Sequence, residues 1–153
     1  MEMATPTLVP LFRMTLAIGG SREIGSTLAG RRRIVQVTGG RFAGPRMQGE
    51  VLAGEDWITE RADGAAAIDV RLPLLTADGH GILMRYRGVR HGPAEVMARL
   101  ARGERVDPRD YYFRIAPTFE PAAGPYEWLA RLVAIGTGTR LPDSVVYDIL
   151  AVE

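Results

Sequence analysis

The clearest chemical pattern in the sequence is a tyrosine and an arginine at alternate positions, Tyr112 and Arg114, followed by Glu120. Residues i and i+2 of a strand share a face, so these two side chains could bind one oxyanion together. Glu120 is then the nearest carboxylate and a candidate general base. The alternative is that the interleaved residues, from Tyr111 to Phe119, form the core face. Tyr112 and Arg114 would in that case lie in solvent.

A second pair of interest, Arg61 and Asp63, stands at an Asp-Gly turn signal. A planar guanidinium at the mouth of a barrel would anchor a carboxylate or enolate oxygen. The alternative is structural, with Asp63-Gly64 making the turn and Arg61 pairing at the rim. A two-residue turn predicts that Trp57 and Arg61 share the apolar face of the sheet with Ile68.

The aromatic and histidine residues supply further candidates. Trp57, Tyr126 and Trp128 could form an aromatic wall for a flat ligand, or serve as structural plugs. His91 precedes a predicted helix and is a candidate proton carrier because imidazole titrates near neutrality. The alternative is a solvated loop histidine. His80 follows a turn and is expected to be exposed.

The composition excludes several mechanisms. The chain of 153 residues has no cysteine and no lysine, so all 19 cationic residues are arginine. These absences exclude disulfides, thiolate metal sites, cysteine nucleophiles, Schiff bases and the phosphate-binding P-loop. Two histidines cannot form a three-histidine metal site, and the acidic residues show no metal-ligand spacing. We therefore expect neither a cofactor nor a metal.

The charge pattern argues against large anionic partners. The formal net charge is +1, which gives no global field for nucleic acid or membrane. The only dense basic run is Arg31–Arg33, and strand alternation would split it between two faces. The N-terminus does not read as a signal peptide, and no segment approaches the roughly 20 apolar residues of a membrane span. The sequence predicts a cytoplasmic protein.

Alternating apolar and polar residues predict a chain of short strands. Two helical segments, 93–102 and 125–132, interrupt them. At the Asp78-Gly79 turn we expect a three-residue loop, because a two-residue loop would turn two arginines toward the core. The predicted strands span 8–18, 31–38, 50–53, 57–61, 65–75, 81–89, 111–119, 132–139 and 144–152.

This pattern predicts a mainly β fold. About eight or nine short strands with glycine-rich turns and one or two short helices indicate an antiparallel barrel or sandwich, not a parallel α/β sheet. Glycine pairs at 19–20 and 39–40 are expected to end strands. With no linker or internal repeat, residues 1–153 are expected to form a single barrel domain.

Several motifs together resemble a bacterial and fungal family known as domain of unknown function 3237. They are, in order, Gly30-Arg-Arg-Arg-Ile34, the glycines from Gly39 to Gly49, Asp56-Trp57, Arg61-Ala-Asp-Gly64, Tyr112-Phe-Arg-Ile-Ala-Pro-Thr-Phe-Glu120, Tyr126-Glu-Trp-Leu129 and the glycines Gly136 and Gly138. The resemblance covers residues 10–152 and implies a lipocalin-like antiparallel β-barrel. It implies little about function. Where the family usually has Trp-Leu-Asn, this chain has Trp128-Leu129-Ala130.

Three hypotheses of function follow. In the first, the barrel binds a small aromatic or apolar metabolite with an anionic or carbonyl oxygen, through Arg61, Arg114, Trp57, Tyr112, Tyr126 and Trp128. In the second, the protein is a cofactor-independent lyase, isomerase or cyclase. Arginine and tyrosine would stabilise an oxyanion while Glu120, His91 or Tyr112 acts in catalysis. In the third, outer apolar residues such as Leu75, Ile82 and Ile58 are buried in a homodimer.

Overall fold

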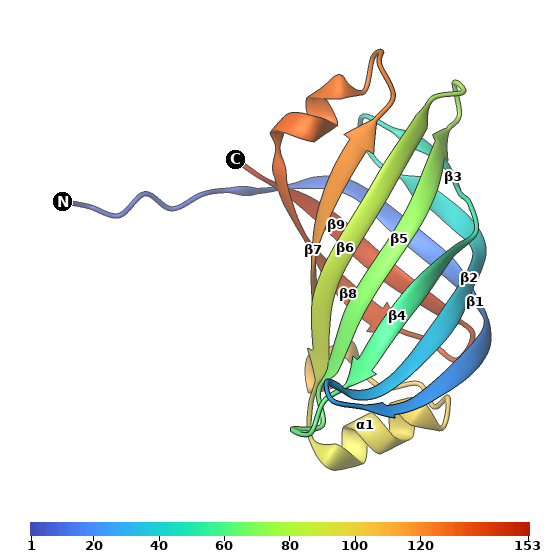
Figure 1. Cartoon of the computed structure of the whole chain (residues 1–153). Coiled ribbons are helices and arrows are strands. Elements are labelled where there is room, and N and C mark those ends of the chain that lie inside the picture. Colours follow the sequence, from blue (N-terminus) through green and yellow to red (C-terminus); the bar gives the residue numbers. More distant parts are fainter.

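The structure, a computed structural model that describes residues 1–153, is a ring of nine antiparallel strands (Figure 1). The order of the strands is β1-β9-β8-β7-β6-β5-β3-β2-β4, and further pairings of β1 with β2 and of β4 with β5 close the ring. The expected mainly β barrel is thereby confirmed. The strands are β1 Leu8–Thr27, β2 Gly30–Ala43, β3 Gln48–Val51, β4 Gly54–Glu60, β5 Ala66–Thr76, β6 Gly81–His91, β7 Tyr112–Pro121, β8 Val133–Arg140 and β9 Ser144–Val152.

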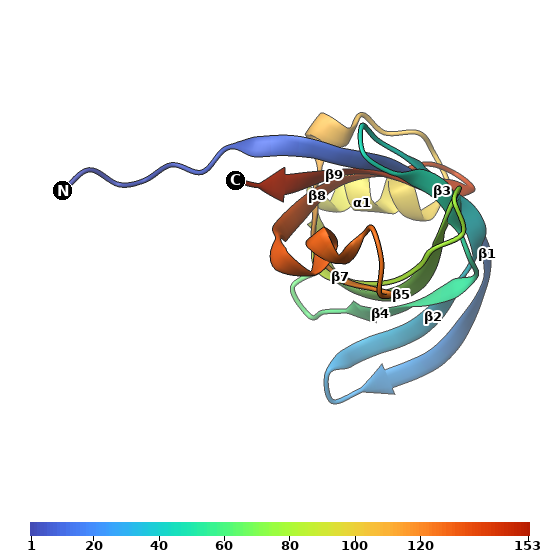
Figure 2. The same ribbon diagram turned by 90° about the horizontal axis from the view of Figure 1, so that it is seen from above.

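Three helices join or cover the strands: α1 Ala94–Ala101 and the 3-10 helices η1 Pro108–Asp110 and η2 Glu127–Arg131. α1 follows Pro93 and ends before Gly103, whose φ of 77° favours glycine, so the prediction for this segment is confirmed. α1 lies across one end of the barrel, and η2 lies at the opposite end (Figures 1 and 2). None of the helices combines the length and apolar character needed to cross a membrane.

β1 and β2 are longer than the glycine pairs predict. β1 continues through Gly19-Gly20, with register shifts against β2 on both sides of Ile18. β2 continues through Gly39-Gly40, where a Cβ on Gly40 would lie 2.1 Å from the carbonyl oxygen of Thr15. The expected strand ends are therefore wrong, because these glycines permit bulges and close strand contact instead of turns. The far end of this hairpin projects beyond the ring (Figure 2).

The β5–β6 hairpin has the predicted register. Leu75 pairs with Gly81, and Thr76 and His80 flank a three-residue loop in which Gly79 has a φ of 87°. Ile82, Met84 and Tyr86 are accordingly buried inside the barrel. The three-residue loop expected at this turn is confirmed.

The β4–β5 hairpin has a different register from the predicted one. The N–H of Arg61 donates to the carbonyl of Ala65, which leaves three loop residues. Only Gly64 in this loop has a positive φ, whereas a two-residue type I′ turn needs two such residues. Asp56 therefore pairs with Val70. The expectation that Trp57 and Arg61 share the apolar face is wrong, because the one-residue slip reverses the faces of β4.

The barrel interior is filled with side chains at the η2 end. Phe12 contacts Phe42 and Phe119 with ring centroids 5.3 and 6.0 Å apart. Toward the α1 end, Phe113 packs over β8, where a Cβ on Gly138 would lie 2.7 Å from its ring. Beyond these aromatic residues the interior is open.

Candidate functional site

A cavity of about 510 Å³ occupies the α1 end of the barrel interior. Every strand except β3 contributes to its walls, and α1 covers it with Met97, Leu100 and Ala101. Half of its lining residues are hydrophobic, including Ile58 and Phe113. A cavity of this size and mixed polarity is typical of a small-molecule site.

Charged side chains gather in this cavity to an unusual degree. Four arginines and three carboxylates line it: Glu23, Arg33, Asp56, Glu60, Arg61, Arg90 and Arg140. Strand alternation explains why several of them point inward. Arg90 continues the buried row of Met84 and Tyr86 on β6, and Arg140 continues the row of Gly136 and Gly138 on β8.

Among the charged residues that line the cavity, Arg90 is the one whose buried side chain lacks a hydrogen-bond partner. Its Nε atom is buried and has no hydrogen-bond partner, and its guanidinium lies 5.3 Å from the ring centroid of Phe113. Burial lowers the pKa of Arg90, and the neighbouring Arg140 and Arg33 lower it further, while Tyr147 and Asp56 oppose the change. A buried guanidinium without a partner favours the entry of an anion.

Asp56 is the carboxylate at the centre of the cluster. One of its oxygens accepts a hydrogen bond from the backbone N–H of Asp69, at 3.3 Å. Burial raises the pKa of Asp56 to about 7, against the opposing effects of that hydrogen bond and of Arg90 and Arg33. The carboxyl group can therefore both release and accept a proton near neutral pH.

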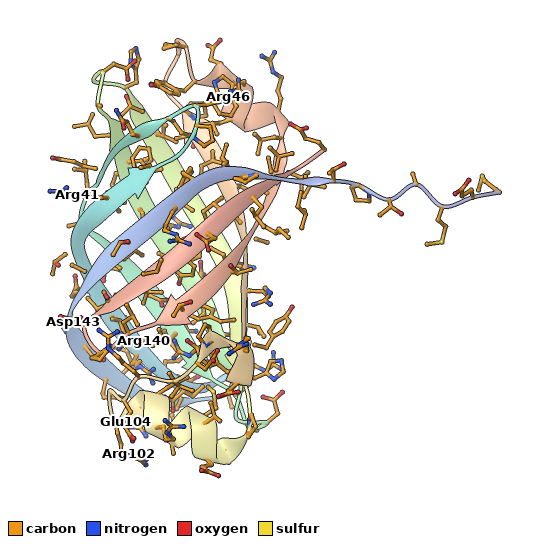
Figure 3. The ribbon with its side chains drawn as sticks, turned by 180° about the vertical axis from the view of Figure 1, so that it is seen from behind. Arg41, Arg46, Arg102, Glu104, Arg140 and Asp143 are labelled. Atoms are coloured by element: carbon orange, nitrogen blue, oxygen red, sulfur yellow. The ribbon has the colours of Figure 1, made fainter.

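The other two interior arginines have partners in the wall. Arg33 forms a partly buried ion pair with Glu60. Arg140 donates to the carbonyl oxygens of Leu141 and Ser144, at 2.6 and 3.3 Å. Figure 3 shows Arg140 near the α1 end of the barrel and Arg46 at the opposite end. Carbonyl oxygens do not neutralise a guanidinium, and Asp143 attracts Arg140 without forming an ion pair with it, so Arg140 has no ion-pair partner.

Two buried tyrosines complete the polar group of the interior. The rings of Tyr86 and Tyr147 meet edge to face, 5.2 Å apart, and Tyr147 also contacts Phe113. Tyr147 lines the cavity, whereas Tyr86 is fully enclosed. Burial raises the pKa of both hydroxyls, with a further contribution from Asp56. Tyr147 therefore stays protonated and can donate a hydrogen bond to a ligand in the cavity.

Most of the side chains that the sequence singles out lie on the outer face of the barrel. Tyr112 is 45% exposed, stacks on His91 at 5.0 Å between centroids, and lies 5.1 Å from the guanidinium carbon of Arg114. These three residues form one outer cluster. Tyr112 and Arg114 therefore face solvent, which is the second of the two arrangements expected for this strand.

Trp57 and Glu120 lie on a second part of the outer face. Both line an open depression of about 870 Å³ on the outer face of β4 to β7, between charges of both signs. It is larger than the interior cavity but lacks a buried polar group. Among the expected dimer residues, Leu75 is partly exposed at 38%. Ile58 and Ile82 are buried inside at 4% and 2%, so the outer position expected for them is wrong.

The remaining candidates lie at the two ends of the barrel. Arg61 lines the edge of the interior cavity, but its guanidinium pairs with Asp63 at the hairpin end. This agrees with the structural role for the pair, in which Arg61 pairs at the rim of the barrel. Tyr126 and Trp128 belong to the η2 end. Tyr126 donates to Asp78 at 2.8 Å, and the guanidinium of Arg46 lies 3.6 Å from the ring centroid of Trp128. The candidates therefore lie in four separate places: the outer cluster, the outer depression, the edge of the interior cavity and the η2 end.

Strand alternation in the sequence points to part of the interior cluster, although no motif contains it. Extending the buried row of β6 by two further alternations leads to Arg90. Of the three adjacent arginines, Arg33 faces inward opposite Ile58, while Arg32 pairs with Thr59 on the other face. Asp56 could not be assigned to the interior, because its orientation depends on the β4–β5 register.

Nearly the whole chain is similar to proteins from bacteria. It is 35% identical to the UPF0311 protein RPA1785 of Rhodopseudomonas palustris over 148 residues, which cover 95% of this chain and 97% of that protein. The crystal structure of RPA1785, a conserved protein of unknown function, covers 99% of this chain and 100% of its own with a TM-score of 0.95.

Two further crystal structures share the fold. A beta-barrel like protein from Acinetobacter baumannii is 39% identical, with 99% of each chain covered and a TM-score of 0.86. An enzyme from Penicillium herquei is 24% identical, with 100% of this chain and 98% of that chain covered and a TM-score of 0.74, a likeness in fold alone. The model of a protein family of unknown function, DUF3237, matches residues 6–152. The chain therefore belongs to the DUF3237 family.

Proposed function

We propose that the protein binds a small aromatic or apolar organic molecule with an anionic or carbonyl oxygen in its interior cavity. The observation that carries the proposal is Arg90, whose buried Nε has no partner although the cavity beside it is open. An oxyanion in the cavity would supply the missing acceptor. Arg140, a second lining arginine without an ion-pair partner, favours the same class of ligand.

The interior residues fall into two groups, those that would bind the oxyanion and those that would contact the rest of the ligand. Arg90 and Arg140 would hold the oxyanion, with the hydroxyl of Tyr147 as a neutral donor. Phe113 and the α1 residue Met97 would contact the body of the ligand. Arg61 lies at the edge of the cavity and is already paired with Asp63. We therefore assign it to the entrance of the cavity and not to the group that holds the oxyanion.

Isothermal titration with a set of aromatic acids, beginning with benzoate and benzoylformate, tests this function. Arg90→Gln is expected to weaken binding of a ligand found in this way by roughly 10-fold or more, since charge-assisted hydrogen bonds contribute about 1.5–3 kcal/mol. Arg87→Gln is the matched control: it removes the same group from the same strand, but Arg87 lies on the outer face. Equal loss in both variants, or no binding by the unaltered protein, would contradict the proposal.

A second candidate function is that of a cofactor-independent lyase, isomerase or cyclase. Glu120 and His91 give it no support, because both are exposed on the outer face of the barrel. Asp56 favours it instead, as a carboxyl group that lies in the cavity and titrates near neutrality. This candidate requires the ligand to carry a proton that Asp56 can remove.

A further inference from the structure

We propose, on the basis of the binding function above, that Asp56 is the catalytic residue of a proton transfer on an enolisable carbonyl compound bearing a carboxylate. The substrate class follows from the arrangement of the cavity. Arg90 and Arg140, which have no ion-pair partner, suit a carboxylate and a developing enolate oxygen, and a separate carboxyl group suits the removal of a carbon-bound proton.

Asp56 is better suited to this task than the other two cavity carboxylates. Glu60 is engaged by Arg33 in an ion pair, and Glu23 lies exposed on the projecting β1–β2 hairpin. Asp56 accepts one backbone hydrogen bond, from Asp69, and no side chain donates to it. The arginines of the cavity thus influence its charge without occupying its oxygens, which leaves a lone pair free to accept a proton.

The proposed step is redox-neutral and needs no co-reactant. The Asp56 carboxylate removes a proton from the carbon next to the carbonyl group. The C–H electron pair forms the new carbon–carbon double bond, and the carbonyl π electrons move to oxygen to give an enolate. Arg90 and the Tyr147 hydroxyl stabilise that oxygen, and Asp56 then returns the proton either to the same carbon or to the enolate oxygen.

The pKa of Asp56 is consistent with both the removal and the return of the proton. Its pKa of about 7 means that ionised and protonated forms both occur near neutral pH. A general acid–base catalyst is most effective when its pKa lies near the working pH. A carboxylate with the ordinary pKa of 3.8 is a weaker base and would remove the proton less readily.

Phenylpyruvate is a suitable probe, because it combines an aromatic ring, a carboxylate, a carbonyl group and exchangeable protons at C3. We expect the protein to accelerate exchange of these protons in D2O at about pH 8, measured by proton NMR, and Asp56→Asn to reduce the protein-dependent rate by about 100-fold or more. Glu120→Gln, which alters an exposed carboxylate on the outer face, should leave the rate unchanged.

Benzoylformate separates failure of this inference from failure of the binding function. It resembles phenylpyruvate but has no proton next to its carbonyl group, and Asp56→Asn should still bind it, which shows that the cavity of the variant is intact. If benzoylformate binds through Arg90 while exchange is absent or survives in Asp56→Asn, the catalytic inference is overturned and binding stands. If neither compound binds, both proposals fail.

Discussion

Arg33 and Glu60 form an ion pair in the wall of the cavity, on neighbouring strands β2 and β4. Glu60 pairs with Ala66 and Ala66 with Arg90, so the carboxylate of the ion pair comes from the same row of the barrel as Arg90. Glu60 therefore reduces the positive charge that a bound anion would meet.

Glu60→Gln is expected to tighten anion binding. The substitution keeps the size of the side chain and releases Arg33, and a gain of about 0.5–1 kcal/mol corresponds to roughly a 2- to 5-fold lower dissociation constant. Titration with benzoylformate measures the change. Glu50→Gln removes an exposed carboxylate from β3, outside the cavity, and should leave affinity unaltered. Weaker binding by Glu60→Gln would mean that the ion pair orders the site.

Asp56 should make the stability of the protein fall as the pH rises. Its pKa in the folded chain, about 7, exceeds the ordinary value of 3.8, so between these values the folded state binds more protons than the unfolded state. The free energy of unfolding therefore declines from about pH 4 to about pH 7. The full cost of ionising Asp56, on the order of 4 kcal/mol at 1.36 kcal/mol per pKa unit, is present above that range.

Asp56→Asn removes this penalty. Urea unfolding between about pH 4 and pH 8 should show the variant gaining stability relative to the unaltered protein as the pH rises. Asp110→Asn, at an exposed position in η1, should preserve the original pH dependence. A constant difference between Asp56→Asn and the parent across this range would rule out a titrating Asp56.

The two Asp-Gly hairpins show how far local sequence determines this fold. The burial of Arg85 and Arg87 would be so costly that it selects the three-residue loop between β5 and β6. No such penalty distinguishes the two registers of β4, because Trp57 and Ile58 can each occupy an apolar face. The strand is correctly expected from its composition, but the direction of its side chains depends on backbone conformation at Gly64.

The candidate site could be predicted less well than the strands, for a related reason. A polar residue on a strand is normally assigned to solvent, and this rule holds for Arg114 and Glu120. It fails for Arg90 because the barrel is filled only at the η2 end. Whether a barrel encloses space depends on residues from all its strands, such as Phe113 packing over Gly138, and not on the pattern of any single strand.

Gly138 is expected to resist substitution because the Phe113 ring lies over it. A Cβ at this position would lie 2.7 Å from the ring, so Gly138→Ala must displace Phe113 and should destabilise the protein by about 1–3 kcal/mol. Gly20→Ala is the matched control, because a Cβ at Gly20 meets nothing within 4 Å. Chemical denaturation of both variants measures the difference. Equal stabilities would show that Phe113 moves aside without cost.

Tyr126 and Asp78 provide a test at the opposite end of the barrel. Hydrogen bonds from the hydroxyls of Thr76 and Tyr126 lower the pKa of Asp78 to about 2. A carboxyl group with a lowered pKa stabilises the fold above its ordinary value of 3.8, and this contribution is lost as the pH falls toward about 2. This contact joins the β5–β6 turn to the segment before η2.

Tyr126→Phe should therefore raise the pKa of Asp78 toward 3.8 while leaving the hydrogen bond from Thr76 in place. Carbon-13 NMR of the aspartate carboxyl groups measures the pKa directly. Tyr112→Phe removes an equivalent hydroxyl from the outer cluster and should not affect Asp78, since Tyr112 stacks on His91 instead. Binding of benzoylformate should be the same in both variants, because neither hydroxyl lines the interior cavity. A change in affinity for Tyr126→Phe would instead connect the η2 end to the ligand site.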